Sequence, residues 1–189
     1  MTEQTTSEWT VDEARRSASG TAAQGVAWLI AFALTLSIAA ALSFTLPLNV
    51  AVLVAVFQGG AALPLAFALE RKLGTGPMAA DHPLRSLSVQ LAMVQILALP
   101  AVIMMYTLNP ALVPATFAAI GGAHFLPYVW LHRTRIYLVL ALAVSLGSWA
   151  ITLSGVEGAY RLVMIWWPLC YIVAAGLLWR RHRQLHPAT

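Results

Sequence analysis

The chain has 189 residues, of which 60% are hydrophobic and only 10% are charged, and its mean hydropathy is +0.76. A soluble domain carries about 25% charged residues, so this chain cannot cover a water-exposed surface, and its composition predicts an integral membrane protein. The single cysteine, Cys170, excludes a disulfide within the chain and any multi-cysteine metal site.

The N-terminal segment, residues 1–24, is too polar for a secretory signal, and no cleavage motif follows a short apolar core, so we expect no processing. Thr10 and Glu13 have the spacing of a capping box, in which each side chain binds a backbone N–H of the other residue. This spacing predicts a short helix from Thr10 through Arg16 that lies at the membrane surface. Because the helix is short, a disordered segment is the alternative.

Six apolar windows follow, each about 20 residues long and thus able to cross roughly 30 Å of hydrocarbon. They fall near residues 25–44, 50–69, 87–108, 111–132, 136–154 and 162–179. The predicted fold is therefore an all-α bundle of six transmembrane helices over residues 25–179. Its short connections predict three helical hairpins, at about 25–69, 87–132 and 136–179, followed by a basic tail at 180–189.

The basic residues are concentrated on one side of the predicted bundle. All 11 lysines and arginines except Arg161 lie before the first window, in the second and fourth connections, or after the sixth window. This positive-inside pattern predicts a bacterial inner-membrane protein with both termini in the cytoplasm, and no nucleic-acid partner is needed to explain the charge. We expect Arg180-Arg181-His182-Arg183 to anchor at lipid headgroups in general rather than at a specific lipid site. We also expect the histidines of the loops and the tail to be solvated, namely His82, His182 and His186.

An internal repeat is suggested by two glycine pairs. Gly59-Gly60-Ala61 and Gly121-Gly122-Ala123 are 62 residues apart, and a Leu-Pro pair follows each of them. The repeat would make the first two hairpins copies of one another. The glycines and the prolines Pro64, Pro100, Pro127 and Pro168 are explained either by close helix packing or by discontinuous helices that expose backbone to a solute.

A sparse set of neutral polar groups remains inside the windows, which contain no Asp, Glu, Lys or Arg near mid-membrane. This absence removes support for carboxylate-coupled transport, a retinal Schiff base and a voltage sensor. His124 and Gln95 are expected at one depth because a short link joins their helices. The predicted interior polar cluster consists of His124, Gln95, Gln58, Tyr128, Ser148 and Trp167. It either binds a solute or only joins helices by hydrogen bonds.

Small residues recur on the fifth window, where Ala141, Ala143, Ser145 and Gly147 form overlapping pairs four residues apart. Such a stripe allows close helix contact in lipid. It predicts a homodimer or larger assembly, with packing inside one chain as the alternative.

Glu13-Ala14-Arg15-Arg16 and the stretch from Gly121 to Arg135 together resemble an uncharacterised family of small six-span bacterial inner-membrane proteins. Members begin with a polar segment of the first kind and have a glycine-rich fourth span that ends in aromatic residues and a basic loop. The resemblance implies the six-span fold and adds no functional residues.

Two classes of function fit these observations. The first is a small channel, exporter or permease that binds a neutral polar solute at the interior polar cluster. The second is a non-catalytic membrane module or accessory subunit in which the cluster is structural. An enzyme is less favoured because no nucleophile or metal motif accompanies His124, and we expect no cofactor, no metal and no partner beyond membrane lipid, an unidentified solute and a second copy.

Overall fold

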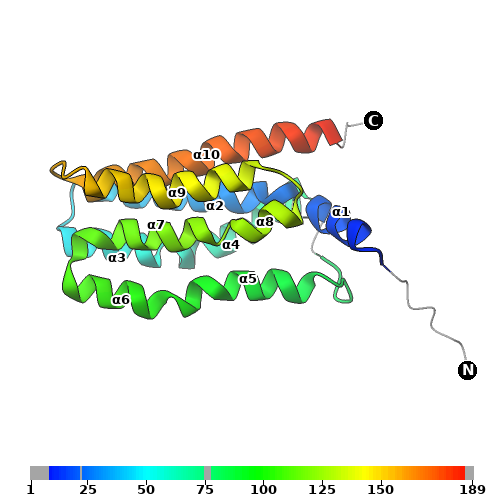
Figure 1. Cartoon of the computed structure of the whole chain (residues 1–189), viewed down its shortest axis with the longest axis horizontal. Coiled ribbons are helices and arrows are strands. Elements are labelled where there is room, and N and C mark those ends of the chain that lie inside the picture. Colours follow the sequence, from blue (N-terminus) through cyan, green and yellow to red (C-terminus); the bar gives the residue numbers. More distant parts are fainter. Residues whose placement is uncertain (1–8, 22, 75–77, 186–189) are drawn as a thin grey trace, which may run out of the picture.

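The computed structural model describes residues 9–21, 23–74 and 78–185, and these residues form helices and connecting turns, with no strand among them (Figure 1). The helices are α1 (Val11–Thr21), α2 (Val26–Leu42), α3 (Leu48–Phe57), α4 (Gly59–Leu73), α5 (Arg85–Leu97), α6 (Leu99–Leu108), α7 (Val113–Ala123), α8 (Leu126–Leu131), α9 (Ile136–Leu153) and α10 (Ala159–Leu185). Two 3-10 turns, η1 (Ala23–Gly25) and η2 (Pro110–Leu112), precede α2 and α7. The prediction of an all-α fold is confirmed.

Within the described residues, six segments are long and apolar enough to cross a membrane, as the six windows predict. They are Ala23–Leu42, Leu48–Leu73, Arg85–Leu108, Pro110–Leu131, Ile136–Leu153 and Ala159–Leu185. The second, third and fourth segments each consist of two helices in tandem, whereas the fifth and sixth are single helices. The protein is therefore a multi-pass membrane protein.

The helices form a bundle with a densely packed side and a sparse edge (Figure 1). α10 packs against both α2 and α9, α4 packs against α2, and α7 packs against α9. The tandem pair α5–α6 forms the opposite edge and is joined to the bundle mainly through α6 and α7. α1 lies at the same end of the bundle as the last turns of α10, and we call this the basal end.

The predicted arrangement as three hairpins is not confirmed. The most extensive packing joins α2 with α10 and α7 with α9, which belong to different predicted hairpins. In the second predicted hairpin, α6 packs against α7 in one half of the span, while α5 makes little contact with α8 in the other half. The short link at Asn109 therefore makes the two spans neighbours without packing them along their full length.

The interrupted spans have a partial explanation in proline. A proline has no N–H for the carbonyl four residues before it, and its ring clashes with that carbonyl. The third segment is interrupted at Ala98, just before Pro100, and the fourth at His124-Phe125, just before Pro127. By contrast, α10 continues through Pro168.

The predicted repeat is not supported at the interruptions. The second segment is interrupted at Gln58, immediately before the first glycine pair. The fourth segment is interrupted at His124-Phe125, after the second glycine pair. Equivalent residues therefore do not have equivalent positions relative to the break.

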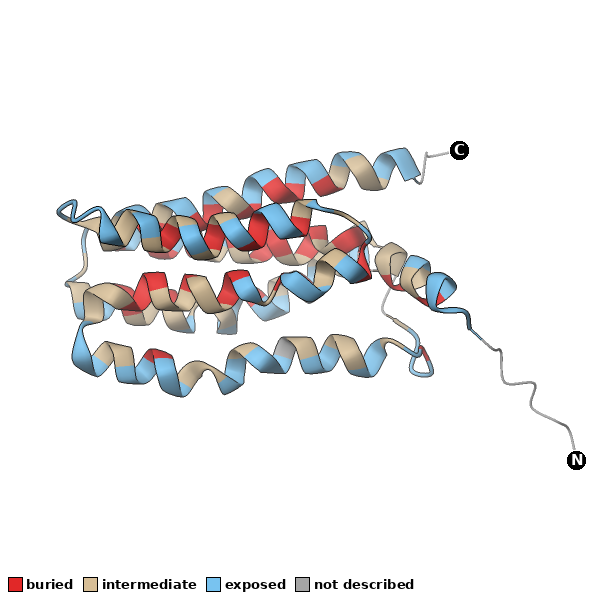
Figure 2. Cartoon of the chain, in the orientation of Figure 1, coloured by how far each residue is buried: buried red, intermediate tan, exposed pale blue. Residues whose placement is uncertain are grey.

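Burial follows the same division between the two sides of the bundle (Figure 2). The core lies between α2, α7, α9 and α10, with Leu36, Val144, Val163 and Leu178 among its members. In the most apolar window of the third span only 12% of the residues are buried, against 50% for the first span. Most of the α5–α6 surface is thus apolar and uncovered, as expected for a helix that faces lipid.

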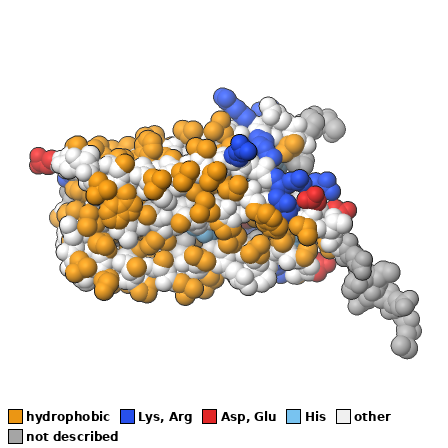
Figure 3. Space-filling model, in the orientation of Figure 1, with side chains coloured by type: hydrophobic (Ala, Val, Ile, Leu, Met, Phe, Trp, Pro, Cys, Tyr) orange, Lys and Arg blue, Asp and Glu red, His pale blue; other side chains and the backbone are white. Residues whose placement is uncertain are grey.

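The surface charge is also asymmetric. On the face drawn in Figure 3, hydrophobic side chains cover the length of the bundle, and Lys and Arg side chains gather at the basal end. A band free of charge between polar ends is the surface expected of a protein that crosses a bilayer.

The small-residue stripe of α9 packs within the chain. A Cβ atom added to Gly122 of α7 would lie 2.2 Å from Ser145 Oγ, and Ser145 Oγ donates a hydrogen bond to Ala119 O at 3.0 Å. On α10, Trp166 Nε1 donates to Ala143 O at 2.9 Å, and its ring lies against Gly147. The stripe is therefore used for intrachain packing, which was the alternative interpretation, and an assembly of several copies stays a prediction.

Candidate functional site

His124 lies at the break between α7 and α8, where the helix direction is interrupted before Pro127. The centroid of its ring is 5.2 Å from that of Tyr128. The imidazole also interacts with the backbone of Leu91 on α5. Its Nδ1 atom is buried and has no hydrogen-bond partner among the described residues. His124 is therefore a polar group between the main bundle and the sparse edge helix α5.

An aromatic cluster connects His124 with the interior of the bundle. Phe125, next to His124, has its ring centroid 5.4 Å from that of Tyr171 on α10. The centroid of the Trp167 ring lies 6.1 Å from that of the Tyr171 ring. A Cβ atom at Gly121 would lie 3.0 Å from the Trp167 ring, so the glycine allows this indole to pack against the α7 backbone. The structure thus links the predicted site residues His124, Tyr128 and Trp167 through ring contacts.

The other predicted site residues lie apart from this cluster. Gln58, at the break between α3 and α4, is hydrogen-bonded through Oε1 to the hydroxyl of Thr35 on α2. Ser148 is buried on α9, and its hydroxyl has no hydrogen-bond partner in the described part of the chain. Gln95 is half-buried on α5, and no hydrogen bond joins its side chain to His124. The α5 group beside the imidazole is instead the backbone of Leu91, one helical turn from Gln95.

A second polar cluster, at the basal end, was not predicted. Arg181 donates from Nη1 to Gln24 Oε1 at 2.9 Å and to the carbonyl of His132 at 3.2 Å, and from Nη2 to the carbonyl of Arg133 at 3.2 Å. The hydroxyl of Tyr137 donates to the carbonyl of Gln24. Ser19 Oγ lies 3.0 Å from His132 Nδ1. We call Ser19, Gln24, His132, Tyr137 and Arg181 the basal network.

The basal network is built around a left-handed turn of the backbone. Ala23, Gln24 and Gly25 have φ angles of 44°, 56° and 81°. Such angles are unfavourable for residues with a Cβ atom, so the surrounding contacts must hold the turn. Gln24 is only 2% exposed, and both its carbonyl and its side-chain oxygen are hydrogen-bonded. The turn directs the chain from α1 into α2.

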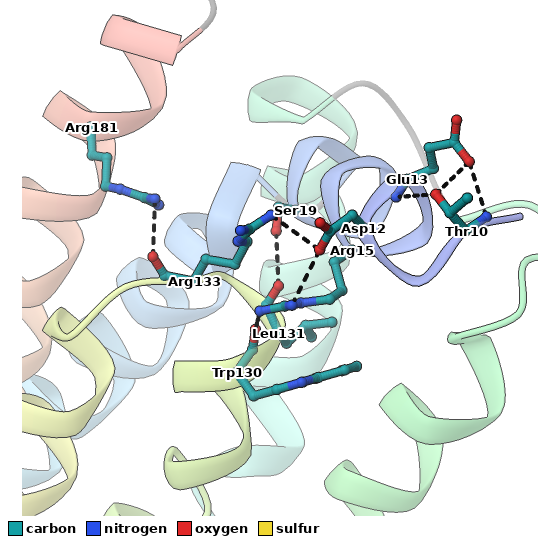
Figure 4. Close-up of polar contacts among 9 residues, drawn as sticks. All are labelled: Thr10, Asp12, Glu13, Arg15, Ser19, Trp130, Leu131, Arg133 and Arg181. Atoms are coloured by element: carbon teal, nitrogen blue, oxygen red, sulfur yellow. Dashed lines mark hydrogen bonds and ion pairs between the residues drawn. The ribbon is translucent and has the colours of Figure 1, made fainter.

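The N-terminal helix is held against the basal end by several contacts (Figure 4). Arg15 donates to the carbonyl of Trp130 and lies 4.5 Å from the centroid of its ring. Asp12 forms an ion pair with Arg133 at 3.1 Å. α1 is therefore bound to the α8 end of the fourth span.

The predicted capping box starts α1. The backbone N–H of Thr10 donates to Glu13 Oε2 at 2.9 Å, and the backbone N–H of Glu13 donates to Thr10 Oγ1 at 3.3 Å (Figure 4). Hydrogen bonds from the Thr10 side chain and backbone lower the pKa of the Glu13 carboxyl. The helix begins where the sequence predicts but continues to Thr21, well beyond Arg16. Its predicted contact with the membrane surface stays a prediction.

The sequence contained only weak signals for the basal network. Gln24 is a polar residue at the first position of an apolar run, and His132 stands at the end of another. Arg181 lies in a basic run that predicts a headgroup anchor, but its side chain bonds inside the protein because Gln24 and two carbonyls are within its reach. These partners come from distant parts of the chain, so sequence spacing does not reveal them.

His132 should make the stability of the protein depend on pH. It lies just beyond the end of its span, and burial, together with the positive charge of Arg181, lowers its pKa to about 3. An unfolded histidine has a pKa of about 6.5, so between these values the unfolded chain binds one more proton. The free energy of unfolding should therefore fall as the pH falls below about 6.5, by at most about 1.4 kcal/mol per pH unit from this group.

Thermal unfolding in detergent between pH 7 and pH 5 measures this dependence. His132→Asn has no titrating ring and keeps an acceptor near Ser19, so its unfolding temperature should vary less steeply with pH than that of the wild type. Equal slopes for the two proteins would show that His132 is already protonated in the folded state or does not control the dependence.

These clusters offer hydrogen-bond donors and acceptors. A neutral imidazole donates from one nitrogen and accepts at the other, and the tyrosine hydroxyl does both. No hydrogen bond joins His124 to a serine, cysteine or carboxylate in the described ranges. The same residues include no group of three or more His, Cys, Asp or Glu side chains placed to hold a metal ion.

Comparison with known proteins confirms one part of the resemblance, the match to an uncharacterised family. No curated protein and no solved structure matches the chain. A family profile matches residues 11–181, which include α1, the first five spans and the sixth as far as Arg181. The match covers most of the sequence, and the chain therefore belongs to DUF7010, a family of unknown function.

Proposed function

We propose that this protein is a small channel, exporter or permease that binds a neutral polar solute between α5 and the α7–α8 break. The observation that supports this proposal best is the buried Nδ1 atom of His124, which has no hydrogen-bond partner among the described residues. A polar atom without a partner is costly in a membrane interior, where ionisable groups usually serve a function. A solute hydroxyl or amide would satisfy it.

The interrupted spans also support the proposal. Each span has one end that lies opposite the basal end of the bundle. Measured from that end of their own spans, the breaks at Gln58 and Ala98 each lie ten residues along the helix, or about 15 Å. The break at His124 is fourteen residues from that end, or about 21 Å. The breaks therefore occur within about one or two turns of the same depth in three consecutive spans, and solute sites of transporters are built from such discontinuous helices.

The sparse packing of α5 gives this site a route for exchange. α5 has little contact with α8, so a change in its position breaks few contacts. Elements with few buried contacts are those that move most readily in a folded protein. A shift of α5 away from Leu91's present position would expose His124 and Tyr128.

The proposal includes the orientation in the membrane. The basal end, which carries all lysines and arginines except Arg161, is assigned to the cytoplasm of a bacterial inner membrane. Both described ends of the chain would then be cytoplasmic. The assembly of two or more copies is part of the same proposal, although the α9 stripe is used within the chain.

Cysteine labelling tests both the site and the orientation. In a chain with Cys170→Ser, single cysteines at Leu91 and Gln95 should react with a polar, membrane-impermeant thiol reagent much faster than a cysteine at Leu34, which is 52% exposed in the middle of α2. The reason is that thiol reagents need a water-exposed thiolate. In intact cells, Val156→Cys between α9 and α10 should react from outside, and Leu185→Cys should not.

The second function class, a non-catalytic module, is favoured by the hydrogen bond of the Gln58 side chain. Its hydrogen bond with Thr35 supports a packing role for this predicted site residue. If cysteines at Leu91 and Gln95 react as slowly as the one at Leu34, no water reaches His124, and the structural role replaces the solute site.

A further inference from the structure

A cavity of about 500 Å³ lies at the basal end where the loop before α5 meets the helix. Its lining includes Asp81, His82, Arg85, Ser86, Val89 and Gln90. Arg85 is the first residue of a membrane span, so the cavity lies at the level of lipid headgroups. It is separate from the His124 cluster and from the basal network.

His82 is buried in this loop, which corrects the prediction that it is solvated. It is only 5% exposed because its ring packs against Trp9, with centroids 5.2 Å apart. Its Nδ1 accepts the backbone N–H of Leu84 at 3.1 Å, so the proton of a neutral ring lies on Nε2. Nε2 is buried and has no hydrogen-bond partner in the described part of the chain. The loop thus places an unused N–H donor beside the cavity.

Arg85 and the start of α5 add positive charge at the same place. The guanidinium is held by one long contact, from Nη1 to Ala80 O at 3.4 Å, and its side chain is exposed at the cavity. No side chain caps the N-terminus of this 13-residue helix. Free N–H groups and the helix dipole favour an anion there. With His82, these groups form a donor set suited to a phosphate.

Asp81 also lines the cavity and restricts the kind of phosphate that fits. Its carboxylate repels a phosphate dianion, whereas a phosphodiester carries only one negative charge. The same carboxylate can accept hydrogen bonds from an ammonium group attached to that phosphate. The protein's donors, at His82, Arg85 and the start of α5, match a headgroup phosphate, and its acceptor, Asp81, matches a headgroup ammonium group. Together they fit a zwitterionic headgroup whose amine carries N–H groups.

An apolar track leads from the cavity along α5. Val89, Met93 and Leu97 follow at intervals of four residues, on one face of the helix, and are 57%, 46% and 76% exposed. Val89 is itself part of the cavity lining. A lipid acyl chain that followed this track would cover side chains of the least buried span.

We propose that this cavity is a binding site for the headgroup of a phospholipid, with the phosphodiester held by Arg85 and the Nε2–H of His82 and the headgroup amine facing Asp81. The acyl chains lie along Val89, Met93 and Leu97. The chemistry is that of phosphatidylethanolamine. Phosphatidylcholine has the same net charge but no N–H donor for the carboxylate, so the site distinguishes the two lipids.

Native mass spectrometry of the full-length protein, titrated in detergent with each lipid, tests the proposal. The wild type should bind phosphatidylethanolamine about tenfold more tightly than phosphatidylcholine, since hydrogen bonds to charged groups are lost with the second lipid. Arg85→Gln should weaken binding of both lipids about tenfold. Asp81→Asn should remove most of the preference, because a neutral amide attracts an ammonium group only weakly.

Matched variants separate the site from general effects. His82→Asn keeps an acceptor for the Leu84 N–H but loses the Nε2 donor and the ring contact with Trp9, so it should weaken lipid binding and also lower the unfolding temperature somewhat. Arg135→Gln changes an exposed arginine that does not line the cavity and should leave binding unchanged. Equal wild-type affinities for the two lipids, or equal losses in Arg85→Gln and Arg135→Gln, would overturn the proposal. Displacement of the lipid by inorganic phosphate would assign the site to a soluble phosphate instead and overturn the lipid assignment.

Discussion

Replacing Arg181 with leucine should lower the free energy of unfolding by about 3 kcal/mol. The guanidinium donates to Gln24 Oε1 and to the carbonyls of His132 and Arg133, and leucine replaces none of these bonds. The oxygen of the buried Gln24 side chain would be left without its described partner, and the left-handed turn would lose a hydrogen bond that helps to hold it. Unfolding in mixed micelles, followed by tryptophan fluorescence, measures the loss.

The neighbouring arginine supplies the control. Arg180 is exposed, and substitutions of exposed residues usually change stability by no more than about 0.5 kcal/mol, so Arg180→Leu should have little effect. Arg181→Lys keeps the charge but lacks the planar fork that reaches several acceptors, and its stability should lie between the two. If Arg180→Leu and Arg181→Leu destabilise the protein equally, the basal network does not contribute as described.

Gly25→Ala should also destabilise the protein, by about 3 kcal/mol. A left-handed conformation costs a residue with a Cβ atom about 1–2 kcal/mol. The added Cβ would also lie 2.3 Å from the hydroxyl oxygen of Tyr137, which would have to move away from the carbonyl of Gln24. Loss of a bond to a buried carbonyl adds about 1–3 kcal/mol. The same unfolding assay measures the sum.

Gly20→Ala is the matched control for this change. Gly20 lies inside α1, and a Cβ atom there would meet nothing within 4 Å. Because alanine is favoured over glycine within a helix, this variant should be more stable than the wild type by about 0.5–1 kcal/mol. A Gly25→Ala protein as stable as Gly20→Ala would mean that the turn does not have the conformation described.

The spans were predictable because hydropathy is a property of local sequence. Each apolar window overlaps one span, and the Thr10–Glu13 spacing locates the start of α1, since both signals depend only on residues close together in the chain. The prolines at positions 100 and 127 also indicate where two spans break. These local signals do not indicate which spans pack together, and the expected hairpins were not confirmed.

The candidate site was predictable only in part for the same reason. His124 and Tyr128 are four residues apart on consecutive turns, and they do lie together. The partner expected on α5 was Gln95, but the helix presents the backbone of Leu91 instead, because the rotation of a sparsely packed helix is not fixed by the depth of its residues. His82 was expected in water because it lies in a loop between two apolar windows, whereas Trp9, 73 residues earlier, packs against its ring.

The contact between Gln24 and Arg181 also bears on how the protein is made. The two residues are separated by 157 positions, and every one of the six spans begins or ends between them. During synthesis the turn before α2 emerges first and has no partner for its side chain until the last span has entered the bilayer. A chain stalled or misinserted at any earlier span would therefore keep this left-handed turn without the hydrogen bond from Arg181.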